Sequence, residues 1–213
     1  MTEPDAHAAR RKYARLARRY DRSLALLKPL LSRYRRRAVD ALELEPGDTV
    51  FDVGAGTGAS LELLVGAVGP RGRVVAIEPS EAMLHEARAR ATREHWRNVE
   101  FREATAQQVA SLPVGDAALF FLTHDILQSP GALENIVRSL RPGARVASFG
   151  AKDGPRPTRR VMRRFTARFV TTLDGMEAPW RHLAATLMNL EVESLGHGHA
   201  YLACGTIGQP PAD

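Results

Sequence analysis

A run of three alternating glycines constrains the fold of this 213-residue chain more than any other feature. Residues 51–60 read Phe-Asp-Val-Gly-Ala-Gly-Thr-Gly-Ala-Ser, which places Gly54, Gly56 and Gly58 directly after an apolar stretch. Glycine adopts backbone angles that other residues avoid, and it lets the backbone come close to a ligand. The pattern predicts a buried strand that turns sharply into a helix, whose first amides can donate hydrogen bonds to a ligand. The segment is therefore a candidate nucleoside-cofactor site.

The glycine spacing alone does not identify the cofactor. Gly54, Gly56 and Ala59 also satisfy the dinucleotide pattern G-x-G-x-x-A. The next apolar run, residues 73–77, ends at Glu78, about 20 residues beyond the loop, where a carboxylate can accept hydrogen bonds from both ribose hydroxyls. These features fit NAD as well as a cofactor with a single nucleoside.

The acidic residue ahead of the glycines favours a cationic cofactor. A carboxylate at Asp52 would repel a pyrophosphate and attract a positive charge. With this residue, the segment 50–58 resembles the first motif of the class I methyltransferases, which use S-adenosylmethionine.

Three more segments carry the same resemblance, which extends from about residue 20 to residue 205. They are Pro-Gly-Asp at 46–48, Ala-Ile-Glu-Pro-Ser at 76–80 and Leu-Arg-Pro-Gly-Ala-Arg-Val at 140–146. Within the superfamily the chain looks most similar to the ubiquinone/menaquinone-biosynthesis type of small-molecule methyltransferase.

The resemblance implies S-adenosyl-L-methionine as cofactor and S-adenosyl-L-homocysteine as product. Residues 54–58 would hold the amino-acid part, Glu78 the ribose, and Met83 would cover the adenine. Related enzymes often carry an acidic residue for the adenine amino group where this chain has Thr105, which can accept one hydrogen bond while the Ala106 amide donates another. The implied cofactor-binding residues are Asp52, Gly54, Ala55, Gly56, Thr57, Gly58, Glu78, Pro79, Met83, Thr105, Ala106 and Thr123.

Alternating apolar runs predict an α/β fold. Strands are expected at 49–53, 73–77, 98–102, 116–122 and 144–149, with helices at 58–68, 80–92, 105–110 and 130–140. Such alternation implies a parallel sheet covered by helices on both faces. Residues 190–197 and 199–206, joined by Gly-His-Gly, predict a terminal hairpin and hence an antiparallel strand. The resemblance implies a Rossmann-like, seven-stranded, mostly parallel sheet whose last strand is antiparallel, an ending that NAD-binding folds lack.

The chain length and the 44% of hydrophobic residues predict one domain with four parts. Residues 1–45 would form a helical cap, with helices at 6–20 and 23–44, and residues 46–150 the cofactor-binding core. The Gly-Pro-Arg-Pro segment at 154–157 breaks the alternation and opens an inserted helical lid over residues 151–189, before the hairpin at 190–206.

The catalytic candidates follow the fourth predicted strand, where Thr123, His124 and Asp125 reach the edge at which ligands bind in open α/β sheets. Methyl transfer is an in-line displacement that depends mainly on alignment of two bound reactants. His124, with an unperturbed pKa of about 6.5, is the candidate base, and Asp125 could orient it or act instead. In the alternative, His124 contacts only the cofactor and Asp125 caps the next helix. Tyr20, Phe169 and Trp180 are candidate substrate-binding residues, and packing explains them equally well.

Composition bears on partners and location. The net charge of +6 arises mainly from residues 10–37 and 156–168, which invites a nucleic-acid hypothesis. Helical spacing of the basic residues favours a solvated face, and no nucleic-acid motif stands out. The single cysteine, Cys204, rules out an intramolecular disulfide and a multi-cysteine zinc site, and no metal site is expected. No apolar run approaches the roughly 20 residues of a membrane span, so a cytoplasmic protein is expected. Both a monomer and a homodimer remain open.

The sequence thus predicts transfer of a methyl group from S-adenosylmethionine to a small organic acceptor, with O-, N- and C-methylation all open. Methylation of RNA or protein is the alternative that the arginine-rich segments motivate. A further alternative is a protein that keeps the cofactor pocket and uses the bound molecule without transferring its methyl group.

Overall fold

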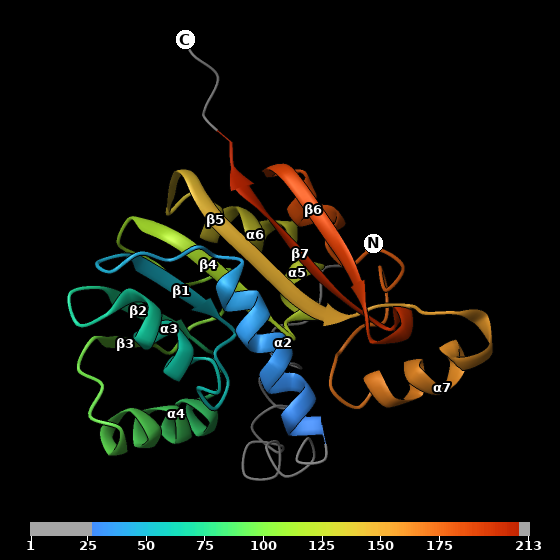
Figure 1. Ribbon diagram of the computed structural model, residues 1–213, viewed down its shortest axis with the longest axis horizontal. Coiled ribbons are helices and arrows are strands. Elements are labelled where there is room, and N and C mark those ends of the chain that lie inside the picture. Colours follow the sequence, from blue (N-terminus) through green and yellow to red (C-terminus); the bar gives the residue numbers. More distant parts are fainter. Residues whose placement is uncertain (1–26, 209–213) are drawn as a thin grey trace.

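Seven strands form one sheet at the centre of the structure, a computed structural model that describes residues 27–208 (Figure 1). Tyr20 and the helix expected at 6–20 lie outside the described residues. The strands are ordered β3-β2-β1-β4-β5-β7-β6 across the sheet. Their bounds are β1 Thr49–Val53, β2 Arg73–Ile77, β3 Val99–Arg102, β4 Gly115–Phe121, β5 Leu140–Ala151, β6 Leu187–Leu195 and β7 Ala200–Ile207.

The strand directions confirm the predicted topology. Strands β1 to β5 pair in parallel, while β7 lies between β5 and β6 and pairs antiparallel with both. The first two strands have the predicted bounds, because each is a short, mostly apolar run that is buried in the sheet and therefore visible in the sequence. In β1, Val50, Phe51 and Val53 are all fully buried.

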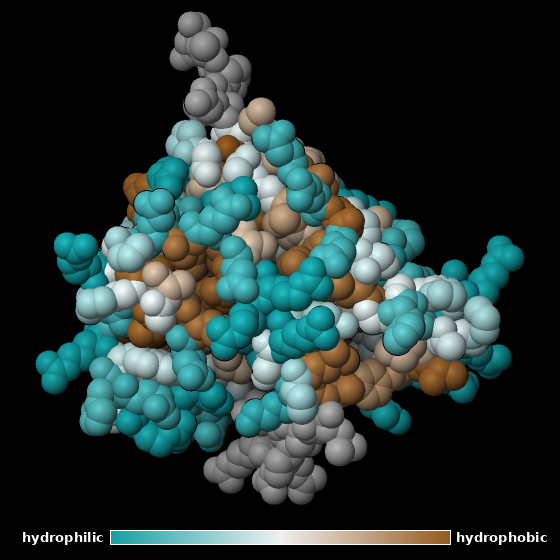
Figure 2. All heavy atoms as spheres, in the orientation of Figure 1, coloured by the Kyte–Doolittle hydropathy of each residue, from teal (hydrophilic) through white to brown (hydrophobic). Residues whose placement is uncertain are grey.

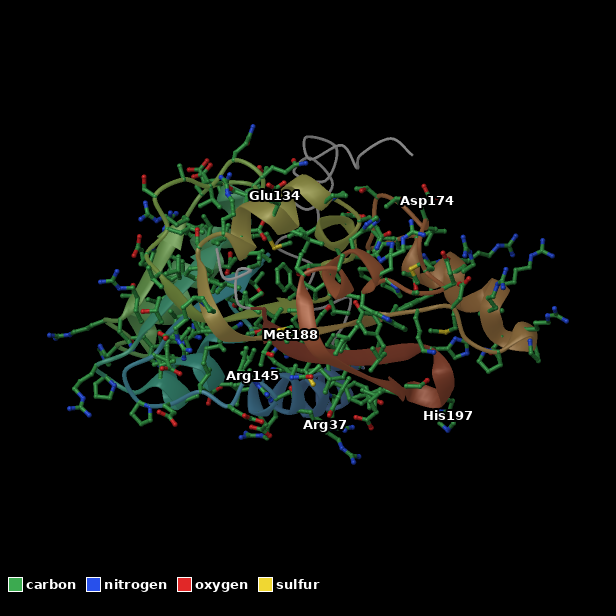
Figure 3. The ribbon with its side chains drawn as sticks, turned by 90° about the horizontal axis from the view of Figure 1, so that it is seen from above. Arg37, Glu134, Arg145, Asp174, Met188 and His197 are labelled. Carbon is green, nitrogen blue, oxygen red and sulfur yellow. The ribbon has the colours of Figure 1, made fainter. Side chains whose placement is uncertain are left out.

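Helices cover both faces of the sheet, as predicted. Side chains of α2 (Lys28–Asp40), α3 (Leu61–Val68) and α4 (Glu81–Arg93) join one hydrophobic cluster with one face. Those of α5 (His124–Leu127), α6 (Pro130–Val137) and α8 (Arg181–Ala184) join the cluster on the other. Figure 3, seen from above, places the labelled Arg37 of α2 and Glu134 of α6 on opposite sides of the sheet.

The prediction of a helix at 105–110 is wrong, because these residues form only a single turn. The amide of Val109 donates to the Thr105 carbonyl at 2.9 Å, but the turn does not propagate. The Asn135 side-chain amide binds the carbonyls of Ala106 and Val109 at 2.9 and 2.8 Å, so a long-range contact takes acceptors that a longer helix would use. The described part of the helix predicted at 23–44 also ends early, at Asp40.

Residues 151–189 contain one exposed helix and a buried return segment. Helix α7 (Arg156–Thr166) projects from the end of β5 (Figure 1). The chain then returns to the sheet, where Met176 and Leu183 are buried and the Trp180 ring packs against Tyr201 with 4.8 Å between centroids. The division into cap, core, lid and hairpin stays a prediction. None of the described helices is long and apolar enough to cross a membrane.

Candidate functional site

The candidate site lies where β1, β2 and β4 reach their carboxyl ends. The loop after β1 folds onto the end of β2, since the amides of Gly54 and Ala55 both donate to the Ile77 carbonyl, at 2.8 and 3.1 Å. The segment after β4 packs on the same loop, with Thr123 and Ile126 beside Gly54. Loops that are distant in sequence therefore meet at the edge where open α/β sheets bind ligands.

Glycine is present at these three positions for different structural reasons. All have positive φ, at 76°, 57° and 76° for Gly54, Gly56 and Gly58. A Cβ at Gly54 would lie 2.5 Å from Thr123 Cγ2, and one at Gly58 would lie 3.0 Å from Ala87 Cβ, so close packing requires these two glycines. A Cβ at Gly56 would meet nothing within 4 Å. Among the described residues only Gly56 thus leaves room for a ligand at the loop.

Glu78 joins the glycine loop to the next helix. The carboxylate, only 6% exposed, accepts hydrogen bonds from the Ser80 amide at 2.9 Å and the Gly56 amide at 3.1 Å. Burial raises the pKa of Glu78 to about 7, although these two hydrogen bonds oppose the shift. Glu78 therefore fixes the backbone beside the open space at Gly56.

Asp52 is a second buried carboxylate at this edge. The residue is 2% exposed, and its Oδ2 atom has no hydrogen-bond partner among the described residues. Burial raises the pKa of Asp52 to about 7; Arg35 lowers it and Glu78 raises it further. Arg35, on α2, lies over the Phe121 ring at 4.4 Å from its centroid. Arg35 could not be singled out from the sequence, because it is one of several arginines in a helix that precedes the core.

Four buried polar atoms at this edge lack a partner within residues 27–208. They are Asp52 Oδ2 in β1, Ser80 Oγ after β2, and Thr123 Oγ1 and His124 Nδ1 after β4. Buried polar groups in proteins are nearly always hydrogen-bonded, so a cluster of exceptions indicates a place for a polar ligand. Sequence reasoning missed Ser80; its position directly after Glu78 and Pro79 was the available signal.

His124 is largely buried, and its ring has a defined role for each nitrogen. Nε2 lies 2.9 Å from the Asp174 carbonyl, which can only accept, so Nε2 carries the proton and Nδ1 is the basic atom. Burial lowers the pKa of His124, against the opposing effect of Asp125. His124 is therefore neutral near pH 7. Asp174, labelled in Figure 3, lies on the same side of the sheet as α6.

Asp125 binds the backbone of the inserted segment. Its carboxylate accepts hydrogen bonds from the Thr171 amide at 3.0 Å and from the Thr172 amide at 3.3 Å. Together with the His124–Asp174 contact, this ties residues 171–174 to α5. The sequence contained no pattern that predicts these contacts.

The remaining predicted cofactor residues line the same edge at varied depth. Ala55, Thr57, Met83 and Ala106 are buried, and Pro79 is partly buried. Thr105 uses its hydroxyl locally, since it contacts Gln108 Oε1 and accepts from the Gln108 amide, both at 3.2 Å. The predicted adenine contact at this position stays a prediction.

Two of the predicted substrate-binding residues, Phe169 and Trp180, pack against different aromatic neighbours. Trp180 packs against Tyr201, whereas Phe169 packs against Phe165 with 5.2 Å between ring centroids. Both contacts are ordinary aromatic packing, so the role of these residues in substrate binding stays a prediction.

Comparison with known proteins finds similarity over the central part of the chain. Residues 50–143 match the family model described as a methyltransferase domain. A 2-phytyl-1,4-naphtoquinone methyltransferase from Thermosynechococcus vestitus is 34% identical over 116 residues, covering 54% of this chain and 51% of the relative. An arsenite methyltransferase from Halobacterium salinarum is 31% identical over 109 residues, covering 49% of this chain and 27% of the relative. The match thus spans about half or less of these curated relatives.

Solved structures share the fold. A SAM-dependent methyltransferase from Aquifex aeolicus superposes with a TM-score of 0.62 at 23% identity, over 81% of this chain and 89% of that one. The N-methyltransferase NodS from Bradyrhizobium japonicum, in complex with S-adenosyl-L-homocysteine, gives 0.61 at 16% identity, over 84% and 88%.

Proposed function

We propose that this chain, a class I S-adenosylmethionine-dependent methyltransferase by its fold and its matched domain, binds that cofactor beside Gly56 and methylates a small organic acceptor. The observation that carries the proposal is the pair of buried carboxylates at this edge: Glu78 accepts a hydrogen bond from the amide of Gly56, beside the open space, and Asp52 leaves its Oδ2 atom without a partner among the described residues. A pair of buried carboxyl groups opposes the binding of a pyrophosphate, and a ligand with positive charge favours their ionised form.

The residues present fit the cofactor. Asp52 Oδ2 is an unpartnered acceptor suited to an ammonium group, and Thr123 Oγ1 can donate to a carboxylate. Glu78 can accept hydrogen bonds from ribose hydroxyls with the oxygen lone pairs that the Ser80 and Gly56 amides leave unused. Met83, buried in the first turn of α4, supplies an apolar contact for the adenine.

When bound, the cofactor supplies an electrophilic methyl group on a sulfonium. The chain's own residues need to orient the two reactants and, for an acceptor that must lose a proton, to take that proton. Neutral His124 can take it at Nδ1, because Nε2–H is held by the Asp174 carbonyl. Asp125 acts as a positioning residue, since its carboxylate holds the Thr171 and Thr172 amides.

The proposed acceptor class is a small organic molecule with an apolar part. Support comes from the naphthoquinone methyltransferase relative and from the aromatic side chains of the inserted region. The position that is methylated is not part of the proposal.

Titration calorimetry with S-adenosylhomocysteine tests the cofactor site. In Gly56→Arg, a bulky cation enters the open space, and we expect no detectable binding where wild type binds. Gly47→Arg is the matched control, because Gly47 also has positive φ, at 110°, and also has nothing within 4 Å of its Cβ position. Equal affinity in wild type and Gly56→Arg would refute the proposed site.

A second measurement separates methyl transfer from cofactor binding alone. Wild type incubated with S-adenosylmethionine and a panel of hydroquinones and phenols should release one S-adenosylhomocysteine per methylated product. An acceptor that is converted without S-adenosylhomocysteine would instead support a non-methylating use of the cofactor.

A further inference from the structure

Helix α7 carries an unusual concentration of positive charge. Five of its eleven residues are arginine, none is acidic, and its first residue, Arg156, stands at the N-terminus, where the helix dipole disfavours a cation. Arg156, Arg160 and Arg164 are spaced four residues apart, so they lie on one stripe and repel one another. Figure 2 shows hydrophilic residues projecting from this part of the molecule. The arrangement has an electrostatic cost that a bound anion would remove.

The arginines of α7 fall into two groups. Arg163 donates to both carboxylate oxygens of Asp153, at 3.2 and 2.9 Å, and Arg159 lies 3.5 Å from the same carboxylate. These contacts hold the inner side of the helix. Arg156, Arg160 and Arg164 are exposed and form no ion pair with any residue of the described chain. The stripe therefore has three guanidinium groups available to an external anion.

The two groups of arginines surround a single concavity. A cavity of about 630 Å³ is lined by Arg156, Arg159, Arg160, Arg163 and Arg164, together with Ala167 and Leu173. Its volume matches that of small-molecule sites, and its walls offer many N–H donors in planar forks suited to phosphate or carboxylate oxygens. None of its lining residues belongs to the glycine loop, Asp52 or Glu78.

The geometry points to a second binding site on α7, for a small organic molecule that carries a phosphate or a comparable multiply charged anionic group. Five guanidinium groups around one hollow favour a ligand with a compact, multiply charged anionic group. Leu173, which lines the cavity, lies between Thr172 and Asp174, the residues held by Asp125 and His124. The site thus adjoins the segment that contacts α5, and it does not depend on the identity of the cofactor.

Calorimetry with inorganic pyrophosphate as the probe tests this site in the full chain. Wild type should bind pyrophosphate, and Arg160→Gln/Arg164→Gln should bind at least about tenfold more weakly, because two charge-assisted contacts are lost. The matched control, Arg71→Gln/Arg97→Gln, removes two exposed arginines far from α7 in the fold and should bind as wild type does. No binding by wild type, or equal loss in both double variants, would overturn the site.

A second variant keeps every arginine. Ala167→Glu places a carboxylate in the cavity wall, one turn from Arg163 and Arg164, and should weaken pyrophosphate binding as well. S-adenosylhomocysteine titration of the same samples shows whether they are folded, since that site lies on other elements. Retention of wild type on phosphatidylglycerol vesicles or on an RNA oligomer, without pyrophosphate binding, would replace the small anion by a surface or a polymer and so contradict the proposal.

Discussion

The edge of the sheet at β1, β2 and β4 gathers buried carboxyl groups, whereas the exposed helix α7 gathers arginines, so the two regions favour ligands of opposite charge. At the sheet edge two carboxylates, Asp52 and Glu78, are buried, and burial raises the pKa of each to about 7. On α7 three arginines are exposed, and water screens them. A buried charge affects the stability of the whole fold, whereas an exposed charge mainly affects the binding of a ligand beside it. The two regions therefore differ in how strongly mutation should affect stability as well as binding.

The largest effect on activity is expected at His124, the candidate base at the sheet edge. His124→Gln preserves a side-chain N–H for the Asp174 carbonyl but removes the basic Nδ1. For an acceptor that must lose a proton, we expect kcat to fall by roughly 10²–10⁴-fold with little change in KM. The check is to compare steady-state kinetics for an acceptor that must lose a proton with those for an acceptor that is already ionised. An unchanged kcat with the protonated acceptor would remove His124 from the chemistry.

Neutralising Asp52 should lower the affinity for the cofactor without lowering the stability of the fold. Asp52→Asn loses a buried anion, so affinity for S-adenosylmethionine should fall about tenfold or more, since hydrogen bonds to charged groups contribute about 1.5–3 kcal/mol. The ligand-free variant should be at least as stable as wild type, because an ion without a full set of partners is no longer buried. Calorimetric titration and urea unfolding measure the two quantities. A variant that binds normally would show that Asp52 does not face the cofactor.

Substitution of Asp125 tests how much the contacts between α5 and the inserted segment contribute to the stability of the fold. Asp125→Ala leaves the Thr171 and Thr172 amides without their acceptor, which should lower the free energy of unfolding by about 1–3 kcal/mol. The control is Glu134→Ala, an exposed carboxylate on α6. If both variants unfold at the same urea concentration as wild type, the contacts of Asp125 contribute little to stability.

The smallest effect is a pH dependence that only the buried carboxylates should produce. Asp52 and Glu78 have pKa values near 7 when folded, against 3.8 and 4.5 ordinarily, so the folded state binds more protons between about pH 4 and 7. Their contribution to the free energy of unfolding therefore increases as pH falls from 8 to 7, by on the order of 1 kcal/mol for the two groups together. Comparison of wild type with Asp52→Asn/Glu78→Gln in thermal melts isolates it. A pH profile that is the same in both proteins would contradict the raised pKa values.

Local patterns predicted the sheet and the glycine loop, while long-range contacts escaped prediction. The strands 49–53 and 73–77 are apolar runs bounded by glycine and charge, so their limits are visible in the sequence. The helix at 105–110 failed because the Asn135 side chain, distant in sequence, takes its carbonyls. Arg35 was missed for a similar reason, since its effect on the Asp52 pKa depends on how α2 packs.

Within the candidate site, the sequence predicted some of the residue roles and missed others. The open space at Gly56 follows from the motif, but the close packing of Gly54 against Thr123 requires knowledge of which loops adjoin. The contacts of residues 171–174 with His124 and Asp125 could not be predicted, because they depend on how the chain returns from α7.

The place of β7 in the sheet has a consequence for how the chain folds. Residues 200–207 follow β6 in the chain, yet they lie between β5 and β6 and are hydrogen-bonded to both. Until they emerge, β6 has no neighbour in the sheet and β5 presents an unpaired edge, which is the kind of surface that invites pairing with another chain. The sheet therefore cannot close between β5 and β6 until β7 has been synthesised, and truncation within β7 would leave both strands unpaired and prone to aggregation.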